Sequence, residues 1–589
     1  MTGSREVVYN NEDISLIVIM DYDRIRGILE QLYGRPAATP ILGDLSRILD
    51  GYRSRLQSRP GGLSQRDSIL LTYPDQIREP GTPPLRSLAA FCRDHLSGVV
   101  SGIHILPFYP WTSDDGFSVV DYKRVLPDYG GWEDIHSLGT GFRLMFDAVI
   151  NHVSIQSRWF REMLRGEPRY QDYFISPPSA ADLSGVVRPR ALPLLTEFTT
   201  ATGDRLIWTT FSADQADLNY QNPSVLLEIV DVLLFYVLQG AAFIRLDAIA
   251  YLWKEPGTGC INLPQTHAII KLFRLILDDL APGVSLITET NVPHADNISY
   301  FGDGTNEARM VYNFSLPPLV LHAFQTGSAE RLSEWASTLA LPSKEVTFFN
   351  FLASHDGIGL NPLRGIVSEE EISQMVQRVR AHGGLISLKS GPDGSPHPYE
   401  LNINYFDALN DPQSDEGLEI QLDRIMTAHA ILLAMQGVPG IYFHSIFGSR
   451  GWPEGVAETG RNRTINRQKF TRAELEATLS SGSTRQAKVF ERMAQLLKAR
   501  AELRAFHPYA AQAVLSVAPG VFGLLRTAPE GGEHVVCLHN VSGEYQHLDM
   551  EVLAPISKPS QTWHDVISGH SVIMNDNFSL DPYESVWLI

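Results

Sequence analysis

Short apolar runs rich in β-branched and aromatic residues alternate with longer segments of helical periodicity through the middle of the chain. The runs are SILLTYPDQI, VVSGIHILPFYP, FRLMFDAVINH, AAFIRLDAIAYL, VSLITETN, TFFNFLASHD and GVPGIYFHS. The segments between them include PSVLLEIVDVLLFYVLQG and THAIIKLFRLILDDLAPG, where apolar residues recur at helical spacing. This alternation indicates parallel βα units. So many units favour an α/β fold of the closed (β/α)8 TIM-barrel type over a small open sheet.

The two ends of the chain and two internal stretches depart from this alternation. Residues 1–64 are predicted to form an N-terminal helical extension packing on the barrel, which itself is expected over 65–505. Residues 153–220, rich in Pro, Ser, Thr and Arg, are predicted to form an inserted small domain after the third strand, and 385–415 a second excursion. The β-like segments of 506–589 predict an all-β C-terminal domain.

Composition narrows the class of protein and its partners. The 589 residues are 44% hydrophobic and 20% charged, as in a globular chain of two or more domains. A net charge of −19 argues against nucleic acid or an anionic membrane as the main partner, so an anionic substrate needs a local cluster of Arg or Lys. The three cysteines lack zinc-ligand or disulfide spacing. With no signal-peptide pattern and no apolar run of about 20 residues, we expect a cytoplasmic protein.

Three carboxylates lie at or just past the ends of the strand-like runs: Asp247, Glu289 and Asp356. Catalytic residues of α/β barrels occupy this position. Arg245 and Asp247 are two residues apart in an otherwise apolar strand, so both side chains enter the same space. Buried charges are costly unless they are paired or functional, which leaves a structural ion pair as the alternative for this segment.

The order and form of these segments resemble the α-amylase superfamily of retaining glycosidases. The matching segments are Asp147-Ala-Val-Ile-Asn151-His152, Arg245-Leu-Asp247, Glu289 and His355-Asp356. HILPFYPWTSDDGFSVVDY, VRPRALPLLT and TNVPHADNISYFGDGTNEARMVYNFSLPPLVLHAF are similar to the sucrose phosphorylase subfamily. Within it, WKEPGTGCINLPQTH, FLASHDGIGLNPLRG and GSR followed by NRTINR most resemble glucosylglycerate phosphorylases. The resemblance spans about residues 65 to 505.

This resemblance implies roles for the three carboxylates. A retaining enzyme needs a nucleophile and an acid/base with carboxyl groups about 5–5.5 Å apart. By resemblance Asp247 is the nucleophile, Glu289 is the acid/base, and Asp356 holds sugar hydroxyls and stabilises developing positive charge. Arg245 would keep Asp247 ionised, because a nearby cation lowers a carboxyl pKa. Taken without the family pattern, Glu289 could instead cap a helix.

Further residues are implied to hold the glucosyl unit. His152 and His355 would bind its hydroxyls, Asp114 and Arg467 would grip its far end, and Phe117 would offer an apolar wall. The alternatives are that the two histidines are satisfied core residues and that Asp114 belongs to a simple turn.

The sequence Arg188-Pro189-Arg190 lies in the predicted insert, where prolines stiffen the loop. Sucrose phosphorylases carry a similar sequence whose second Arg contacts phosphate, so the resemblance gives that role to Arg190. A solvated basic pair is the alternative. A carboxylate-bearing acceptor would need a further cation, and Arg188, Arg364, Arg450 and Arg461 are candidates that the sequence does not rank.

The resemblance thus implies an enzyme, a glucosyltransferase that acts as a phosphorylase. It would convert 2-O-α-D-glucosyl-D-glycerate and phosphate reversibly to α-D-glucose 1-phosphate and D-glycerate, with retention. Sucrose, sucrose 6-phosphate and glucosylglycerol phosphorylases remain alternatives, as does an α-glucosidase or transglucosidase. The expected partners are the sugar and inorganic phosphate. We expect no cofactor and no metal, although some amylase relatives bind calcium near Asn151. A monomer and a homodimer are both compatible with the sequence.

Overall fold

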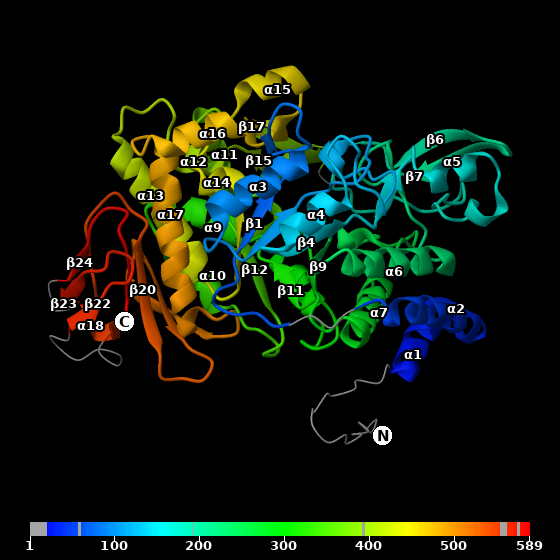
Figure 1. Cartoon of the computed structure of the whole chain (residues 1–589), viewed down its shortest axis with the longest axis horizontal. Helices are drawn as coiled ribbons and strands as arrows, with labels where there is room; N and C mark the ends of the chain where they lie inside the picture. Colours follow the sequence, from blue (N-terminus) through cyan, green and yellow to red (C-terminus); the bar gives the residue numbers. More distant parts are fainter. Residues whose placement is uncertain (1–20, 57–60, 191, 391–394, 554–561, 574–577) are drawn as a thin grey trace.

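The computed structural model describes residues 21–56, 61–190, 192–390, 395–553, 562–573 and 578–589. Eight parallel strands close into a barrel in the spatial order β1-β16-β12-β11-β10-β9-β4-β3 (Figure 1). The barrel strands are β1 (Ile69–Thr72), β3 (Gly102–Ile105), β4 (Arg143–Ala148), β9 (Ala241–Leu246), β10 (Ser285–Thr288), β11 (Met310–Tyr312), β12 (Thr347–Phe351) and β16 (Val438–Tyr442). The predicted (β/α)8 barrel is confirmed.

The sixth barrel strand, β11, was not among the predicted strands. It has three residues and pairs with β10 and β12 on its two sides. Three residues are too few to show strand periodicity against their surroundings. The other seven strands lie inside predicted runs.

The barrel strands are buried on both faces, as parallel strands covered by helices usually are. Every residue of β1, β3, β10 and β12 is buried. The ring is closed by β1 and β16, where Ile69 stands opposite Gly440. Side chains therefore fill the barrel interior, and a ligand site has to lie at the carboxyl ends of the strands.

Helices surround the barrel and cover its strands. The long ones are α3 (Pro84–Leu96), α4 (Trp132–Gly139), α6 (Pro223–Leu238), α7 (Pro264–Leu280), α9 (Leu316–Thr326), α10 (Glu330–Ser337), α11 (Glu369–Ala381), α13 (Leu418–Ala434) and α17 (Arg485–Glu502). Further helices are α8 (His294–Ile298), α12 (Tyr405–Leu409), α14 (Phe443–Ile446), α15 (Pro453–Thr459) and α16 (Arg472–Ser480). Several of them begin with Pro in the first turn, where the missing N–H costs no hydrogen bond.

Two helices at the beginning of the described chain pack on the outside of the barrel: α1 (Tyr22–Tyr33) and α2 (Arg35–Arg53), which lie against α7 and α6 (Figure 1). The Tyr33 hydroxyl donates to the Tyr220 carbonyl at 2.9 Å, and Arg53 pairs with Asp279 at 2.7 Å. Because α2 covers α6 from outside, α6 can be apolar on almost its whole surface. Residues 1–20 of the predicted extension lie outside the described residues.

The chain between β4 and β9 forms a lobe that projects beyond the barrel (Figure 1). It contains β5 (His152–Ser154), α5 (Arg158–Leu164), β6 (Leu195–Thr200), β7 (Gly203–Trp208) and β8 (Gln215–Asp217). The antiparallel pairing of β5 with β8 brings its two ends together at the barrel, and β6 pairs with β7. The loop that carries Arg188 and Arg190 belongs to this lobe.

A second excursion follows β12. It forms a three-stranded sheet in the order β13-β15-β14, made of β13 (Ile358–Gly359), β14 (Leu385–Ser390) and β15 (Pro396–Asn402). A further small sheet pairs β2 (Ile77–Arg78) with β17 (Phe470–Thr471). These additions, and the lobe after β4, place side chains from distant parts of the chain beside the carboxyl ends of the barrel strands.

The C-terminal part is built on an antiparallel sheet of β18 (Ala511–Ala518), β19 (Val521–Thr527), β20 (His534–Asn540) and β25 (Ser585–Leu588). The remaining elements are β21 (Gln546–His547), α18 (Met550–Leu553), β22 (Thr562–His564), β23 (Ser571–Ile573) and β24 (Ser579–Leu580). Trp587 packs on Phe506 of the barrel side, with ring centroids 4.7 Å apart.

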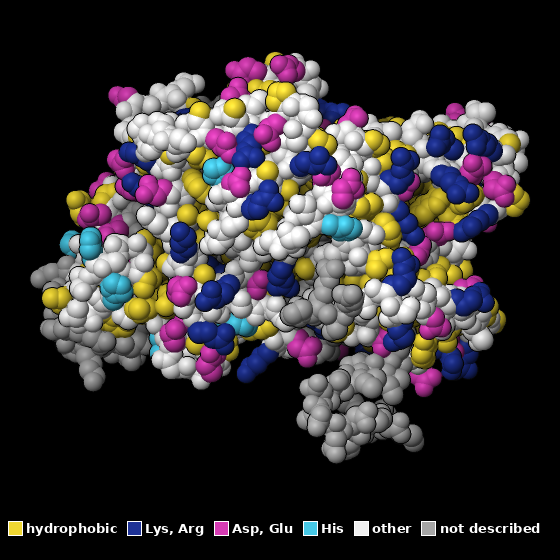
Figure 2. Space-filling model, viewed as in Figure 1, with side chains coloured by type: hydrophobic (Ala, Val, Ile, Leu, Met, Phe, Trp, Pro, Cys, Tyr) yellow, Lys and Arg dark blue, Asp and Glu magenta, His cyan; other side chains and the backbone are white. Residues whose placement is uncertain are grey.

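The surface carries acidic and basic side chains interspersed over the face seen in Figure 2. None of the described helices combines the length and the apolar character that a bilayer crossing needs.

Candidate active site

Arg245 connects three carboxylates at the carboxyl end of the barrel. It is the fifth residue of β9, and Asp247 follows that strand directly. As expected for residues two apart in a strand, their side chains lie together, with Arg245 Nη1 2.8 Å from Asp247 Oδ1. The same nitrogen lies 2.5 Å from Asp147, and Nη2 lies 3.8 Å from Glu289. The ion pair that the sequence left as an alternative therefore exists and also adjoins the pocket.

Asp147 receives a second partner from within the barrel. His104 Nε2, on β3, lies 2.7 Å from its other oxygen, and both side chains are fully buried. Burial raises the pKa of Asp147, but His104 and Arg245 outweigh this and hold the pKa below its usual range. The ionised Asp147 therefore holds the Arg245 guanidinium in place through their ion pair.

Glu289 follows β10 and points into the same space as Asp247. Its carboxylate accepts the Ala248 N–H at 2.9 Å rather than capping the nearby helix α8. Ala248 has a φ of 48°, a left-handed conformation that costs energy for a residue with a Cβ. Burial raises the pKa of Glu289 to about 7, and the charge of Asp247 adds to this while Arg245 opposes it.

Burial likewise raises the pKa of Asp247, although Arg245 lowers it. The sequence predicted a cation beside Asp247, and the structure has it. The guanidinium lowers the pKa of Asp247 as predicted, while desolvation outweighs this effect. Two carboxyl groups that share one guanidinium, one of them protonated near neutral pH, are suited to acid–base and nucleophilic work on a common carbon.

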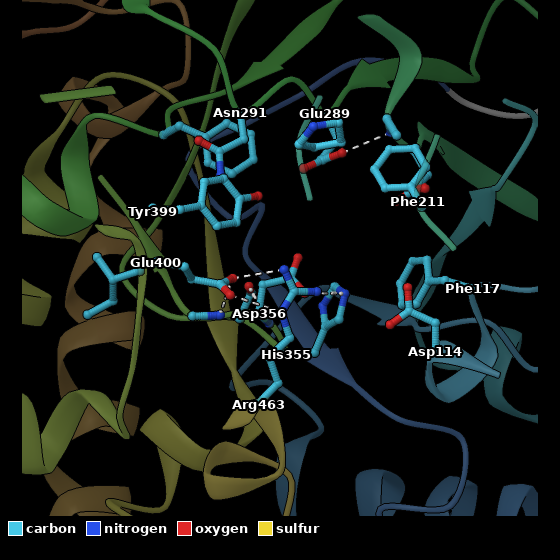
Figure 3. A pocket seen from close by; sticks show the side chains of 18 of the residues that line it. Asp114, Phe117, Phe211, Glu289, Asn291, His355, Asp356, Tyr399, Glu400 and Arg463 are labelled. Atoms are coloured by element: carbon cyan, nitrogen blue, oxygen red, sulfur yellow. Dashed lines mark hydrogen bonds and ion pairs between the residues drawn. The ribbon is translucent and has the colours of Figure 1, made fainter. Parts of the chain in front are cut away.

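Asp356, beyond the end of β12, faces this pair across the pocket (Figure 3). Its Oδ1 lies 2.5 Å from Arg463, 3.5 Å from His355 Nε2 and 3.6 Å from Arg467. Burial raises the pKa of Asp356, but Arg463, His355 and Arg467 together hold it well below the usual range. Arg463 also binds Glu400 through two hydrogen bonds of 2.9 and 3.1 Å.

Two histidines and a phenylalanine form one wall. The rings of Phe117 and His355 stack with centroids 4.8 Å apart and planes 4° from parallel. His152 Nε2 lies 2.9 Å from the Phe117 carbonyl and 3.2 Å from Gln215. Burial lowers the pKa of His355 to about 3, so its ring is neutral. Both histidines are buried and also line the pocket, so their burial does not keep them from meeting a ligand.

Asp114 lies in a tight turn, and its side chain still lines the pocket. Asp114 and Asp115 have φ values of 55° and 50° in the 3-10 segment Asp114–Gly116. Arg190 reaches from the lobe to Asp114 at 2.9 Å. Arg467 instead pairs with Asp115 and donates to the His355 carbonyl at 2.8 Å. Asp114 and Arg467 thus have different ion-pair partners, although both line the groove at the mouth of the pocket.

The side chain of Asn151 is bound by a lysine, which also contacts a carboxylate. Lys254 Nζ lies 2.6 Å from Asn151 Oδ1 and 2.6 Å from Asp217 Oδ2. The buried ammonium of Lys254 already neutralises Asp217, which is the one carboxylate among Asn151, Asp217 and Lys254. They therefore do not fit a calcium ion here. No cluster of three or more His, Cys, Asp or Glu suited to a metal occurs in the described ranges.

These side chains enclose a central pocket of about 920 Å³, its open mouth included (Figure 3). The predicted residues that line it are Asp114, Phe117, His152, Arg190, Asp247, Glu289, His355 and Asp356. Arg245 lies beneath it, Arg467 lines a groove at its mouth, and Arg188 lines a cavity beside it. The sequence analysis missed Phe211, Gln215, Asn291, Tyr399, Glu400 and Arg463. Arg463 precedes Arg467 by four residues in NRTINR, and that helical spacing was the available signal.

Comparison with known proteins agrees with the geometry. The family described as "Alpha amylase, catalytic domain" matches residues 97–361. The chain is 48% identical to a glucosylglycerate phosphorylase of Spirochaeta thermophila, covering 96% of this chain and 98% of the relative. It is 44% identical to that of Escherichia coli, covering 96% and 99%. The structure of sucrose 6F-phosphate phosphorylase from Thermoanaerobacter thermosaccharolyticum has the same fold, with a TM-score of 0.70 at 24% identity over 81% of this chain and 94% of that one.

Proposed function

Since the chain belongs to the family of the glucosylglycerate phosphorylases, within the α-amylase superfamily, we propose that it interconverts 2-O-α-D-glucosyl-D-glycerate and phosphate with α-D-glucose 1-phosphate and D-glycerate. The acceptor is supported by relatives of that name that are 44–48% identical over 96% of the chain. The observation that carries the reaction type is the pair formed by Asp247 and Glu289 around Arg245.

The proposed reaction is a double displacement. Asp247 attacks the anomeric carbon from the face opposite glycerate, while Glu289 gives its proton to the departing glycerate oxygen. A covalent β-glucosyl ester forms on Asp247. Phosphate then attacks the same carbon, Glu289 takes up the proton, and the ester breaks. Two inversions give net retention.

The electrostatic environment supports these roles. With a pKa of about 7, Glu289 holds a proton in a large fraction of molecules at neutral pH and can exchange it in both steps. Arg245 favours the ionised form of Asp247, and the binding of a glucosyl unit brings the nucleophile a partially positive carbon. Asp356, kept ionised by Arg463, would stabilise the oxocarbenium-like transition state and bind sugar hydroxyls. His152, His355 and Phe117 would hold the ring, with Asp114 and Arg467 nearer the mouth.

Phosphate is assigned to Arg190. Its guanidinium is held by Asp114 at the edge of the central pocket and can turn from that carboxylate to an incoming anion. No cofactor takes part in this scheme. The product is a sugar phosphate, which fits the predicted cytoplasmic location. Monomer and homodimer both remain open.

The test is to incubate the protein with α-D-glucose 1-phosphate and, separately, D-glycerate, glycerol, fructose and fructose 6-phosphate, and to follow phosphate release. Release fastest with D-glycerate, and abolished in Asp247→Ala, is the expected result. Faster release with another acceptor would keep the mechanism and change the substrate. Release that needs no acceptor, yet is lost in Asp247→Ala, would indicate a hydrolase and contradict the proposal.

A further inference from the structure

A second cavity lies beside the central pocket and shares Glu289 with it. This side cavity, of about 520 Å³ with its opening included, is lined among others by Arg188, Asn291, Asn361, Lys389 and Tyr399. Asn291 and Tyr399, both labelled in Figure 3, also line the central pocket, so the two spaces adjoin at these residues. A group bonded to the oxygen that Glu289 protonates has this cavity as a place to extend.

Lys389, on β14, brings a cation to this cavity without a counter-ion. Its Nζ lies 2.5 Å from Asn361 Oδ1, a neutral acceptor. Within the described parts of the chain, no carboxylate forms an ion pair with it. Burial, together with the charge of Arg364, lowers the pKa of Lys389 to about 8. A partly desolvated ammonium in this state gains from any anion that reaches it.

Three cations near the mouth already have carboxylate partners. Arg190 pairs with Asp114, Arg461 with Asp115, and Arg463 with Asp356 and Glu400. Lys389 differs from all of these.

The four arginines that the sequence offered as acceptor cations fall into two groups. Two of them lie away from the side cavity, and two lie at it or act on it. Arg450 pairs with Asp407 at 3.0 Å and lines neither cavity. Arg461 pairs with Asp115 at 3.3 Å in the groove at the mouth. Arg188 lines the side cavity and donates to the Leu192 carbonyl. Arg364 acts on this cavity at longer range, because its charge lowers the pKa of Lys389.

We propose that the side cavity is the subsite for the acceptor and that Lys389 binds the carboxylate of D-glycerate, with Arg188 as a second cation. In this acceptor the carboxyl carbon and the glycosidic oxygen are bonded to the same carbon atom. A residue that binds the carboxylate therefore has to lie close to the acid that protonates that oxygen. Lys389 and Glu289 line one cavity and meet this condition. The proposal rests on the proposed function and names a residue for its acceptor specificity.

The experiment compares Lys389→Met, Lys389→Arg and the control Lys344→Met. Lys344 is an exposed lysine that precedes β12 and lines neither cavity. For the wild type and each variant, KM is measured for D-glycerate and for the uncharged acceptor glycerol, with α-D-glucose 1-phosphate as donor. KM for phosphate is measured in the opposite direction. Loss of a charge-assisted bond is expected to raise KM for D-glycerate about 10- to 100-fold in Lys389→Met, with values for glycerol and phosphate within about threefold of wild type. Lys389→Arg should recover part of the loss. The control Lys344→Met should leave all three KM values unchanged.

Three results would overturn the inference. One is an unchanged KM for D-glycerate in Lys389→Met. Another is an equal loss with D-glycerate and glycerol, which would make Lys389 a general structural residue. The third is a raised KM for phosphate alone, which would assign the cavity to phosphate. In each of these the wild type still uses D-glycerate, so the proposed function survives. A wild type that does not use D-glycerate would defeat both.

Discussion

The central pocket and the loops around its mouth differ in how their charges are held. In the pocket, Arg245 and Arg463 each bind two or more carboxylates, and these side chains come mainly from the ends of barrel strands or are locked against them. At the rim, by which we mean the loop 186–192 and strand β14, Lys389 has a neutral partner and apolar side chains are open to solvent. Val187, Leu192 and Leu388 are 44%, 45% and 47% exposed.

This difference separates two tasks. A network of mutually paired charges needs no ligand to be stable, so it can hold the reacting groups in place before substrate arrives. Unpaired cations and exposed apolar side chains gain their partners only when a ligand binds. The pocket therefore suits the step common to the superfamily, and the rim suits the choice of the group that leaves. The following predictions, from the largest effect to the smallest, test this division.

Asp247→Asn should lower kcat/KM for phosphorolysis by at least about 10⁴-fold, because the amide cannot form the glycosyl ester. Steady-state phosphorolysis measures this, with the exposed Asp415→Asn as control. A loss below about tenfold would mean that the nucleophile lies elsewhere and that the pocket's charge network has another purpose.

Glu289→Gln should lower phosphorolysis about 10²- to 10⁴-fold, because no proton reaches the departing glycerate oxygen. Formation of the glucosyl enzyme from α-glucosyl fluoride should suffer much less, since fluoride leaves without a proton. The two donors are compared with the same variant. Equal losses for both would contradict an acid role and indicate a positioning one.

The pH profile of the wild type tests the same residue. Glu289 has to be protonated in the free enzyme, so kcat/KM for the glucoside should be full below its pKa and fall as pH rises through about 7. The profile in Glu289→Gln should lack this alkaline limb. If the limb persists in the variant, another group with a similar pKa is responsible.

Arg463→Met should lower kcat/KM about 100-fold and reduce the free energy of unfolding by roughly 2–4 kcal/mol, since Asp356 and Glu400 lose their shared cation. Arg461→Met is the matched control two residues away. Its guanidinium is half exposed and pairs with Asp115 at 3.3 Å, so a change of less than about threefold is expected. Similar losses in both variants would mean that the shared cation of the pocket matters no more than an exposed ion pair at its mouth. Steady-state kinetics measures kcat/KM, and denaturant unfolding measures the free energy of unfolding.

Arg190→Met should raise KM for phosphate about tenfold and leave hydrolysis of α-D-glucose 1-phosphate nearly unchanged, because water needs no anion site. Arg165→Met, an exposed arginine of the same lobe, serves as control. A parallel fall in hydrolysis would show that Arg190 acts through Asp114 on the glucosyl unit and not on phosphate.

The strand ends that carry Asp247, Glu289 and Asp356 could be predicted because each follows an apolar run long enough to show its character. Strand β11 could not, since it has three residues. Arg463, Glu400 and Lys389 were missed for a different reason. Arg463 lies on a 3-10 segment, where its spacing of four residues from Arg467 was the one available signal. Glu400 and Lys389 lie on excursion strands whose sequence carries no periodicity, and only the pairing of β15 with β13 and β14 brings Glu400 to the pocket. Ion-pair partners also decided the outcome for Arg467, which Asp115 holds near the mouth.

The closure of the barrel between β1 and β16 has a consequence for biosynthesis. The two strands pair through residues about 370 positions apart, so β1 has only one neighbouring strand until β16 has been made. At about 5–20 residues per second, that wait lasts roughly 20–70 s on the ribosome. During this time one apolar strand edge stays open to other chains. Conditions that slow translation should therefore lower the yield of folded protein through aggregation before they affect the finished enzyme.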